Sequence, residues 1–173
     1  MSKGCWALII FVLMLLTPSL NAYALDMKVN DIKTLNIAVE LPADFTEMPD
    51  DWVKIKYPSR NRPQAVYSND SGSVSFGISK MKKPDLIALS EIKDAMLRSM
   101  SRFNPQASSF TVDGYDAWII SFRSQAIDSE LLNMQLITVT KNDFIIATFN
   151  MNESNIGTYK EVGIKSLLSI KFK

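Results

Sequence analysis

The sequence predicts an α+β domain in which an antiparallel sheet is flanked by helices, an α/β/α sandwich. Short segments with alternating apolar and polar residues are typical of strands. Two longer segments instead carry apolar residues at helical spacing. These segments follow one another as strands, helix, strands, helix. Helices with one apolar side, packed on a sheet that is apolar on both faces, satisfy this order.

Alternation predicts four short strands in the first half, over residues 35–41, 52–57, 65–68 and 74–78. Residues 25–33 are polar and mixed, and we expect a loose lead-in there. In the second strand, Lys54 and Lys56 would share one face, because side chains alternate along a strand. These strands are expected to form an antiparallel meander.

After Pro84 the apolar period changes to that of a helix, which is expected over about residues 87–103 with Met96 and Met100 in the core. Asp113-Gly114 is a strong hairpin signal. Further strands are predicted over residues 109–112, 115–124, 132–140 and 144–151. Apolar residues near one stripe predict a last helix over residues 154–168.

Residues 1–24 have the parts of a cleavable secretory signal peptide. Lys3 is basic, an apolar run of about 11 residues follows, and Ala22-Tyr23-Ala24 fits a cleavage site. The run is shorter than the roughly 20 residues of a spanning helix, so no membrane span is expected after cleavage. An uncleaved anchor is the alternative. We expect one domain over residues 25–173, in the periplasm of a bacterium or secreted from it.

The composition makes several kinds of site improbable. The sequence has no histidine, and its single cysteine, Cys5, would leave with the signal peptide. Zinc and copper sites of the usual kind need these residues, as do catalytic triads and cysteine nucleophiles. Lys3 is the only charged residue before Leu25, so the remaining chain has no formal net charge. Nucleic-acid binding is not expected, because it needs a basic excess. No metal or cofactor is expected.

The segment Val39-Glu40-Leu41-Pro42-Ala43-Asp44-Phe45, followed by Trp52, resembles the opening of domains in the PsbP/Mog1/DcrB-like family. The element order is similar to that family over nearly the whole domain. The resemblance implies an α/β/α sandwich and a mostly non-catalytic role as a binding protein, accessory subunit or adaptor. It implies no catalytic residues, since the family shares no catalytic motif. Function inferred from fold alone is a weak argument.

The candidate binding residues are basic: Lys54, Lys56, Arg60 and Arg62. The lysines would lie on one strand face and the arginines on the adjoining loop between Pro58 and Pro63. Such a patch suits a carboxylate or phosphate group. Three further lysines could extend it: Lys80, Lys82 and Lys83. The plainer alternative is a solvated strand face beside an ordinary loop.

The sequence therefore predicts a non-catalytic exported protein that acts by binding another protein. One version is an immunity protein that caps an antibacterial effector, or a factor associated with a secretion system. The alternative is a carrier of a small ligand or lipid, with a pocket between the sheet and the helices. A hydrolase that uses carboxylates in place of histidine is a third possibility, with Asp50-Asp51 and Asp113 to Asp116 as the acidic clusters considered.

Overall fold

The computed structural model describes residues 25–126 and 129–173, and the proposed signal peptide lies outside this part of the chain. Its strands are β1 (Met27–Ile32), β2 (Ile37–Pro42), β3 (Thr46–Glu47), β4 (Ala65–Ser68), β5 (Val74–Lys82), β6 (Gln106–Val112), β7 (Tyr115–Gln125), β8 (Glu130–Val139), β9 (Asp143–Asn152) and β10 (Lys171–Phe172). Its α-helices are α1 (Asp50–Lys56), α2 (Leu89–Ser99) and α3 (Ile156–Leu168).

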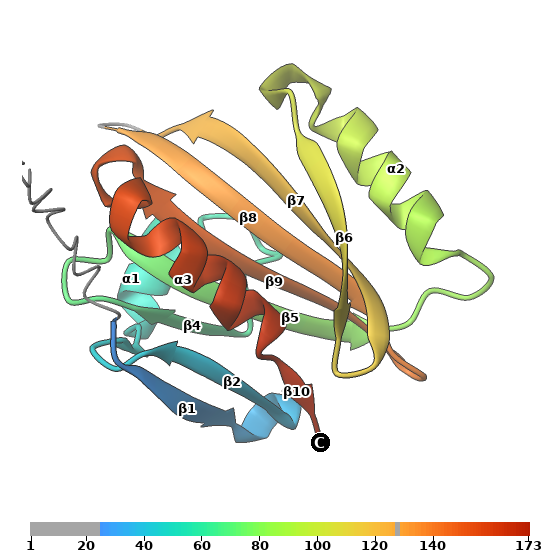
Figure 1. Cartoon of the computed structure of the whole chain (residues 1–173), viewed down its shortest axis with the longest axis horizontal. Helices are drawn as coiled ribbons and strands as arrows, with labels where there is room; N and C mark the ends of the chain where they lie inside the picture. Colours follow the sequence, from blue (N-terminus) through green and yellow to red (C-terminus); the bar gives the residue numbers. More distant parts are fainter. Residues whose placement is uncertain (1–24, 127–128) are drawn as a thin grey trace, which may run out of the picture.

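A seven-stranded antiparallel sheet forms the centre of the molecule (Figure 1), with the strand order β3-β4-β5-β9-β8-β7-β6. Strands β6 to β9 are consecutive neighbours, as a meander requires. Asp113 and Gly114 connect β6 to β7 with φ angles of 49° and 83°. Two positive φ angles are the mark of a type I′ hairpin turn, so the Asp-Gly signal is confirmed.

The main core lies between one face of this sheet, helix α3 and a small second sheet of order β1-β2-β10. Side chains fully buried in this core include Phe45, Phe76 and Phe149. Gly163 of α3 lies against the sheet, since a Cβ on this residue would be only 2.5 Å from Met134 Cε. The helix thus packs unusually close to β8 and β9.

The opposite face of the sheet is covered by α1 and α2. Lys93 of α2 lies 4.5 Å from the ring centre of Trp118 on β7. The hydroxyl of Tyr57, directly after α1, accepts a hydrogen bond from Asn150 Nδ2 of β9 at 3.2 Å. Helices therefore lie on both faces of the sheet, which confirms the predicted α/β/α sandwich.

The predicted strand over residues 52–57 is wrong, because this segment forms helix α1. Pro49 precedes the helix, and Asp50 and Asp51 lie in its first turn. Two lysines, Lys54 and Lys56, lie in its last turn. This distribution of charge stabilises both ends of a helix through its dipole. In a segment of seven residues, the apolar positions fit strand alternation as well as helical spacing. Periodicity alone therefore could not identify the helix.

Two further expectations are corrected. The expected lead-in at residues 25–33 contains β1, whose six residues pair with β2 along their whole length. The helix predicted over residues 87–103 begins at Leu89, and its last part is a separate 3-10 turn at Ser101–Phe103. Met96 and Met100 are only half-buried and lie outside the core.

Among the described residues, no helix is long and apolar enough to cross a membrane.

Candidate functional site

The loop between α1 and β4 is fixed to the sheet at both ends. At its start, the Tyr57 hydroxyl lies 3.4 Å from Ser75 Oγ, within hydrogen-bonding distance. At its end, the Gln64 backbone donates to Ile78 O at 2.9 Å, and its side-chain Oε1 accepts from Lys80 N at 2.8 Å. These contacts hold residues 58–63, the arginine loop, over strand β5.

Gly77 of β5 explains how closely the arginine loop approaches the sheet. A Cβ at this position would lie 3.0 Å from Cγ of Pro63, closer than ordinary van der Waals contact. A glycine inside a strand often marks such a close approach of another part of the backbone. A side chain at this position would require Pro63 to shift by a few tenths of an ångström.

A cleft of about 700 Å³ lies between the arginine loop and the sheet. Its floor crosses three adjacent strands, with Ser79 on β5, Thr148 on β9 and Gln135 on β8. Thr148 pairs with Gln135 in the β8–β9 register, so their side chains lie on the same face. The floor therefore offers hydroxyl and amide groups, which can donate or accept hydrogen bonds. This loop cleft is the strongest candidate site.

Arg60 and Arg62 of the arginine loop line the cleft. Arg62 is ordered by a hydrogen bond from its Nε to Ser59 O at 3.3 Å. Among the described residues neither arginine forms an ion pair, and the charged residues that line the cleft are these two arginines. Unpaired guanidinium groups can bind a carboxylate or phosphate with two parallel hydrogen bonds. The cleft is thus suited to an anionic group.

Tyr57 lines the cleft, and its hydroxyl also belongs to a buried polar cluster with Ser75 and Asn150. Burial raises the pKa of Tyr57, although its hydrogen bonds to Ser75 and Asn150 act in the opposite direction. The hydroxyl therefore stays neutral at physiological pH. Asn150 Oδ1 is buried without a hydrogen-bond partner among the described residues. A buried oxygen without a hydrogen bond costs about 1–3 kcal/mol.

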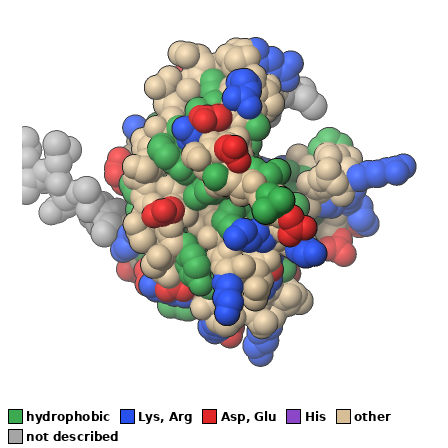
Figure 2. All heavy atoms as spheres, turned by 90° about the vertical axis from the view of Figure 1, so that its right-hand side faces the viewer, with side chains coloured by type: hydrophobic (Ala, Val, Ile, Leu, Met, Phe, Trp, Pro, Cys, Tyr) green, Lys and Arg blue, Asp and Glu red, His purple; other side chains and the backbone are tan. Residues whose placement is uncertain are grey.

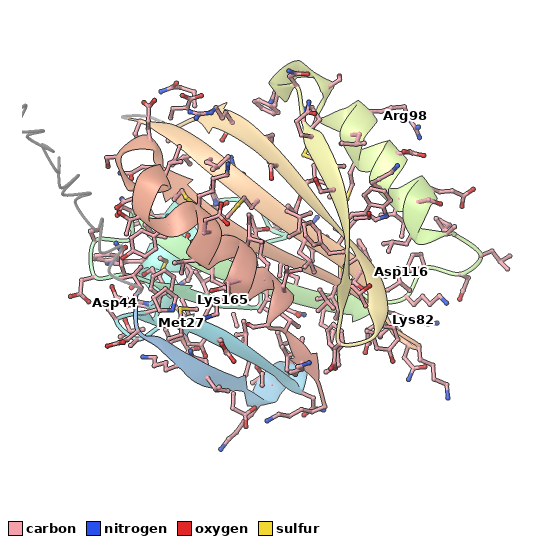
Figure 3. All side chains as sticks on the ribbon, in the orientation of Figure 1. Met27, Asp44, Lys82, Arg98, Asp116 and Lys165 are labelled. Atoms are coloured by element: carbon pink, nitrogen blue, oxygen red, sulfur yellow. The ribbon has the colours of Figure 1, made fainter. Side chains whose placement is uncertain are left out.

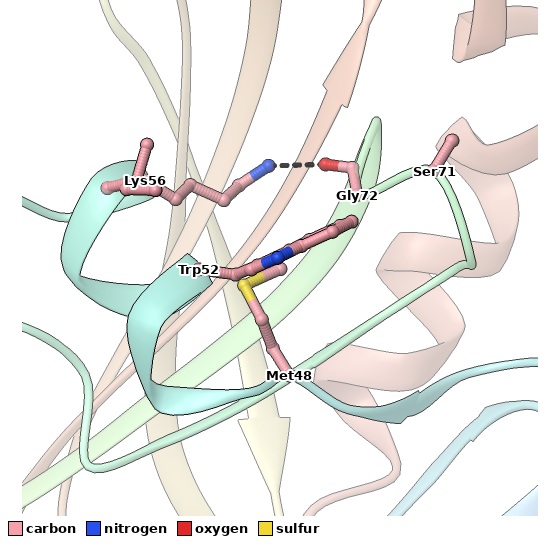
Figure 4. Close-up of a pocket in the computed structure, with 6 residues that line it drawn as sticks. Met48, Trp52, Lys56, Ser71 and Gly72 are labelled. Carbon is pink, nitrogen blue, oxygen red and sulfur yellow. Dashed lines mark hydrogen bonds between the residues drawn. The ribbon is translucent and has the colours of Figure 1, made fainter.

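The two lysines of the predicted patch do not join the arginines in the cleft. Lys54 is exposed and pairs with Asp51 at 3.0 Å. Lys56 points toward the β4–β5 turn, where its Nζ donates to Gly72 O at 2.6 Å (Figure 4). Burial lowers the pKa of Lys56. The prediction that Lys54 and Lys56 share one face of a strand was wrong, because both residues lie in helix α1.

A second depression, of about 410 Å³, lies beside Lys56 (Figure 4) and is largely apolar. Trp52 and Met48 line it together with Gly72 of the turn. Trp52 is 51% exposed and Ile55 is 79% exposed. Neither side chain belongs to the core, so α1 presents two large apolar groups to solvent.

Among the other charged candidates, Lys80, Lys82 and Lys83 line a depression that neither arginine lines, together with Asp85, Lys141 and Asp143. Lys80 donates from Nζ to Leu35 O at 2.8 Å, so its side chain lies on the face of the sheet opposite the cleft. Asp50 and Asp51 lie at the start of α1, and Asp113 accepts from Phe172 N at 2.9 Å. Within the part of the chain that the structure describes, no group of three or more His, Cys, Asp or Glu residues could hold a metal ion.

The arginines of the cleft were predicted, but the cleft itself was not. Its floor comes from strands that are distant in sequence, and only the packing of the loop on β5 creates the space. Gly77 in the middle of an apolar strand pattern was the available signal, because such a glycine indicates a close backbone contact.

No protein-family model and no curated protein sequence matches the chain. Several solved structures do resemble it. The cyanobacterial PsbP (CyanoP) of Synechocystis is 12% identical, with a TM-score of 0.61 over 91% of this chain and 99% of that one. LpqN of Mycobacterium tuberculosis, described as involved in cell envelope biogenesis, is 12% identical, with a TM-score of 0.58 over 85% and 90%.

A putative regulator from Pseudomonas aeruginosa, PA94, is 11% identical, with a TM-score of 0.53 over 85% of this chain and 97% of that one. Together these similarities define the class: the chain has the PsbP-like fold. The resemblance of its opening segment and element order to the PsbP/Mog1/DcrB-like family is thereby confirmed at the level of the fold. At this identity the likeness concerns architecture and not activity.

Proposed function

We propose that this protein is exported to the bacterial cell envelope and works there, without catalysis, by binding another protein. The observation that carries the proposal is the surface of residues 50–64, which presents Trp52, Ile55 and Arg60 to solvent. Tryptophan and arginine are enriched among the residues that dominate binding energy in protein interfaces. Because these side chains are exposed, they add little to the stability of the fold. A role in binding therefore explains their presence on the surface better than a role in folding.

The loop cleft indicates what the partner presents. Arg60 and Arg62 form no ion pair within the described part of the chain, although Arg62 also lines a neighbouring depression with Glu47 and Asp50. The loop that carries them is held by hydrogen bonds. A preorganised site loses less conformational entropy on binding than a mobile one. A partner segment with an acidic side chain fits here, with its carboxylate between the arginines and the polar floor.

Export and the lack of catalysis rest on separate support. Residues 1–24 have the pattern of a signal peptide, and LpqN, which shares the fold, is described as involved in cell envelope biogenesis. The hydroxyl groups of Ser79 and Thr148 lie in a cleft whose charged residues are arginines. A hydroxyl nucleophile needs an adjacent base to be activated, and the sequence has no histidine.

A pull-down from envelope extract of the native bacterium tests the proposal. The wild-type protein is expected to retain one specific partner, and the Arg60→Ala/Arg62→Ala variant is expected to lose it. Arg98→Ala/Arg102→Ala removes the same charge from exposed positions at α2 and serves as the control. Equal recovery of the partner by both variants would contradict a role for the cleft. If the partner is an antibacterial effector, its gene is expected beside this one.

The size of the cleft favours a second candidate, a carrier of a small anionic ligand. Small-molecule sites typically have volumes of about 300–1,000 Å³, and the loop cleft falls in this range at about 700 Å³. Native mass spectrometry of protein purified from its own host separates the two functions. A bound small molecule would favour the carrier, whereas a clean mass together with a captured protein would favour the adaptor.

A further inference from the structure

Strand β6 forms one end of the seven-stranded sheet, so one of its two sides has no neighbouring strand (Figure 1). It covers residues Gln106–Val112 and pairs with β7 along its whole length without a bulge. An open edge of this kind presents backbone N–H and C=O groups that can pair with another chain. Strand β6 is therefore a candidate interaction surface.

The other edge strands of the described chain are protected in ways that are common in natural sheets. Strand β3, at the opposite end of the large sheet, and β10, in the small sheet, have two residues each. Strand β1 carries the charged residues Lys28 and Asp31. Short length and charge both prevent edges from pairing with other chains. Strand β6 has neither protection, since it is longer and contains no charged residue and no proline.

The hydrogen bonding of the β6–β7 hairpin shows which groups of β6 point outward. The two-residue turn Asp113-Gly114 makes Val112 and Tyr115 a hydrogen-bonded pair. Every second residue before Val112 bonds to β7 in the same way, and the residues between them point their N–H and C=O groups away from β7. These outward residues are Ala107, Ser109 and Thr111.

Helix α2 leaves space beside this edge. Its Lys93 lies 4.5 Å from the ring centre of Trp118 on β7, so the helix covers a face of the sheet and not its end. Ser109 is exposed. Together with Phe110 it lines a depression of about 460 Å³, and residues Ala88 to Ser90 at the start of α2 form the other side. A further strand can therefore approach β6.

Charge does not oppose the approach of a second copy of the chain. Asp116 of β7, which Figure 3 shows beside β6, lines the same depression. Lys93 carries the opposite charge near Trp118, and it also pairs with Asp94 at 2.8 Å. Figure 2 looks onto the side of the molecule that carries α2 and the β6–β7 turn, and it shows basic and acidic side chains interspersed. This side has no large area of one charge that would repel an identical surface.

We propose that the partner of this edge is a second copy of the chain, paired antiparallel through its own β6 about a two-fold axis. With Ser109 opposite Ser109 of the second copy, Ala107 lies opposite Thr111. Each outward residue then meets another outward residue, so all their N–H and C=O groups gain partners. The same patch serves both copies, as two-fold symmetry requires.

The side chain of Phe110 supports the same register. Phe110 packs against the main core and is only half-buried in the single chain. With Ser109 at the axis, Phe110 lies opposite Ser108 of the second copy and diagonal to its Phe110. Diagonal neighbours on paired strands are about 7–8 Å apart, which is within reach of aromatic side chains. The loop cleft lies over β5, β9 and β8, so this inference does not depend on the partner proposed for the cleft.

Sedimentation velocity of a protein of residues 25–173, which contains the whole core described above, tests the proposal. Between about 1 μM and about 1 mM, the wild type is expected to pass from monomer to dimer. Ser109→Lys and Ser109→Glu are each expected to weaken the dimer by about tenfold or more, because two like charges then face each other across the axis. An equimolar mixture of the two variants is expected to restore the dimer, since opposite charges then meet.

Thr46→Lys makes the same change of charge at an exposed position of β3, the other edge of the large sheet, and is the control. It is expected to form dimers like the wild type. Restoration by the mixture would also show that both Ser109 variants are folded. A wild type that stays monomeric, as expected if a strand of another protein occupies the edge, would overturn the proposal. A mixture that stays monomeric, or an equal loss of dimer in the control, would overturn it as well.

Discussion

Gly163 lies where α3 comes closest to the sheet, and its missing side chain makes the contact possible. A Cβ here would lie 2.5 Å from Met134 Cε and 2.7 Å from Phe149 Cδ1. Both neighbours are fully buried, so neither can move without disturbing the core. The position of the helix over β8 and β9 therefore depends on this one glycine.

Gly163→Ala is expected to lower the free energy of unfolding by about 1–3 kcal/mol, the usual cost of overpacking a core. Gly157→Ala in the same helix is the control, because a Cβ there meets nothing within 4 Å. Alanine is favoured over glycine in helices by up to about 1 kcal/mol, so this variant is expected to be neutral or slightly more stable. Urea denaturation measures both, and equal effects would contradict the packing account.

Tyr57 holds the start of the arginine loop through Ser75 and Asn150. Tyr57→Phe is expected to cost about 1–2 kcal/mol of unfolding free energy, because Asn150 loses its partner while remaining buried. Tyr115→Phe is the control, since Tyr115 makes a ring contact with Phe172 that the substitution preserves. A cost no larger than that of the control would show that the hydroxyl does not hold the loop.

The same variant makes a prediction about alkaline pH. Because the pKa of Tyr57 is raised in the folded protein, its contribution to stability is complete below its ordinary pKa of 10.0. The contribution is lost as the pH rises through the higher pKa of the folded state. The stability difference between wild type and Tyr57→Phe is therefore expected to shrink above pH 10. Denaturation at a series of pH values measures it, and a constant difference would contradict the assignment.

At the scale of elements, Asp113 joins the β6–β7 hairpin to the C-terminal strand β10. Its Oδ2 accepts from Phe172 N at 2.9 Å, and its Oδ1 lies 3.2 Å from Lys171 Nζ. The hydrogen bond from Phe172 lowers the pKa of Asp113, with a further contribution from Lys171. The contribution to stability is therefore present above the ordinary carboxyl pKa of 3.8 and is lost as the pH falls through the lower folded pKa.

Asp113→Asn is expected to reduce stability at neutral pH by about 0.5–1 kcal/mol, because the pairing with Lys171 is lost. Asparagine tolerates the left-handed backbone of this position, so the turn itself is preserved. The stability of the variant is expected to fall less steeply with acid than that of the wild type. Asp116→Asn, at an exposed position two residues after the turn, is the control. Identical acid curves for all three proteins would contradict the assignment.

The elements differ in how far the sequence could predict them. The Asp113-Gly114 hairpin was predictable because positive φ angles at both residues favour this pair of residue types. Helix α1 was not, because a seven-residue segment is too short for apolar spacing to separate strand from helix. The acidic start after Pro49 and the basic end were the better signals. Strand β1 was missed because most of its side chains are exposed or half-buried, so its residues show no apolar alternation.

The candidate site belongs to the scale of the whole molecule. Arg60 and Arg62 were recognisable from their residue type and their loop between two prolines. Their cleft depends on Gly77, Thr148 and Gln135, which come from three strands and meet only after folding. Sequence patterns indicate local structure well, whereas contacts between distant segments follow from packing. For this reason the charge of the site was predictable and its shape was not.

The proposed function requires that the loop cleft receives a protein partner in the envelope. Site-specific photo-crosslinking in the native bacterium tests it most directly, with the crosslinker at Asn61, an exposed residue of the cleft. Lys160, exposed on α3 over the opposite face of the sheet, is the control position. One protein adduct of defined mass is expected from Asn61, and it is expected to disappear when Arg60 and Arg62 are replaced by alanine. No adduct from Asn61, or the same adduct from both positions, would contradict it.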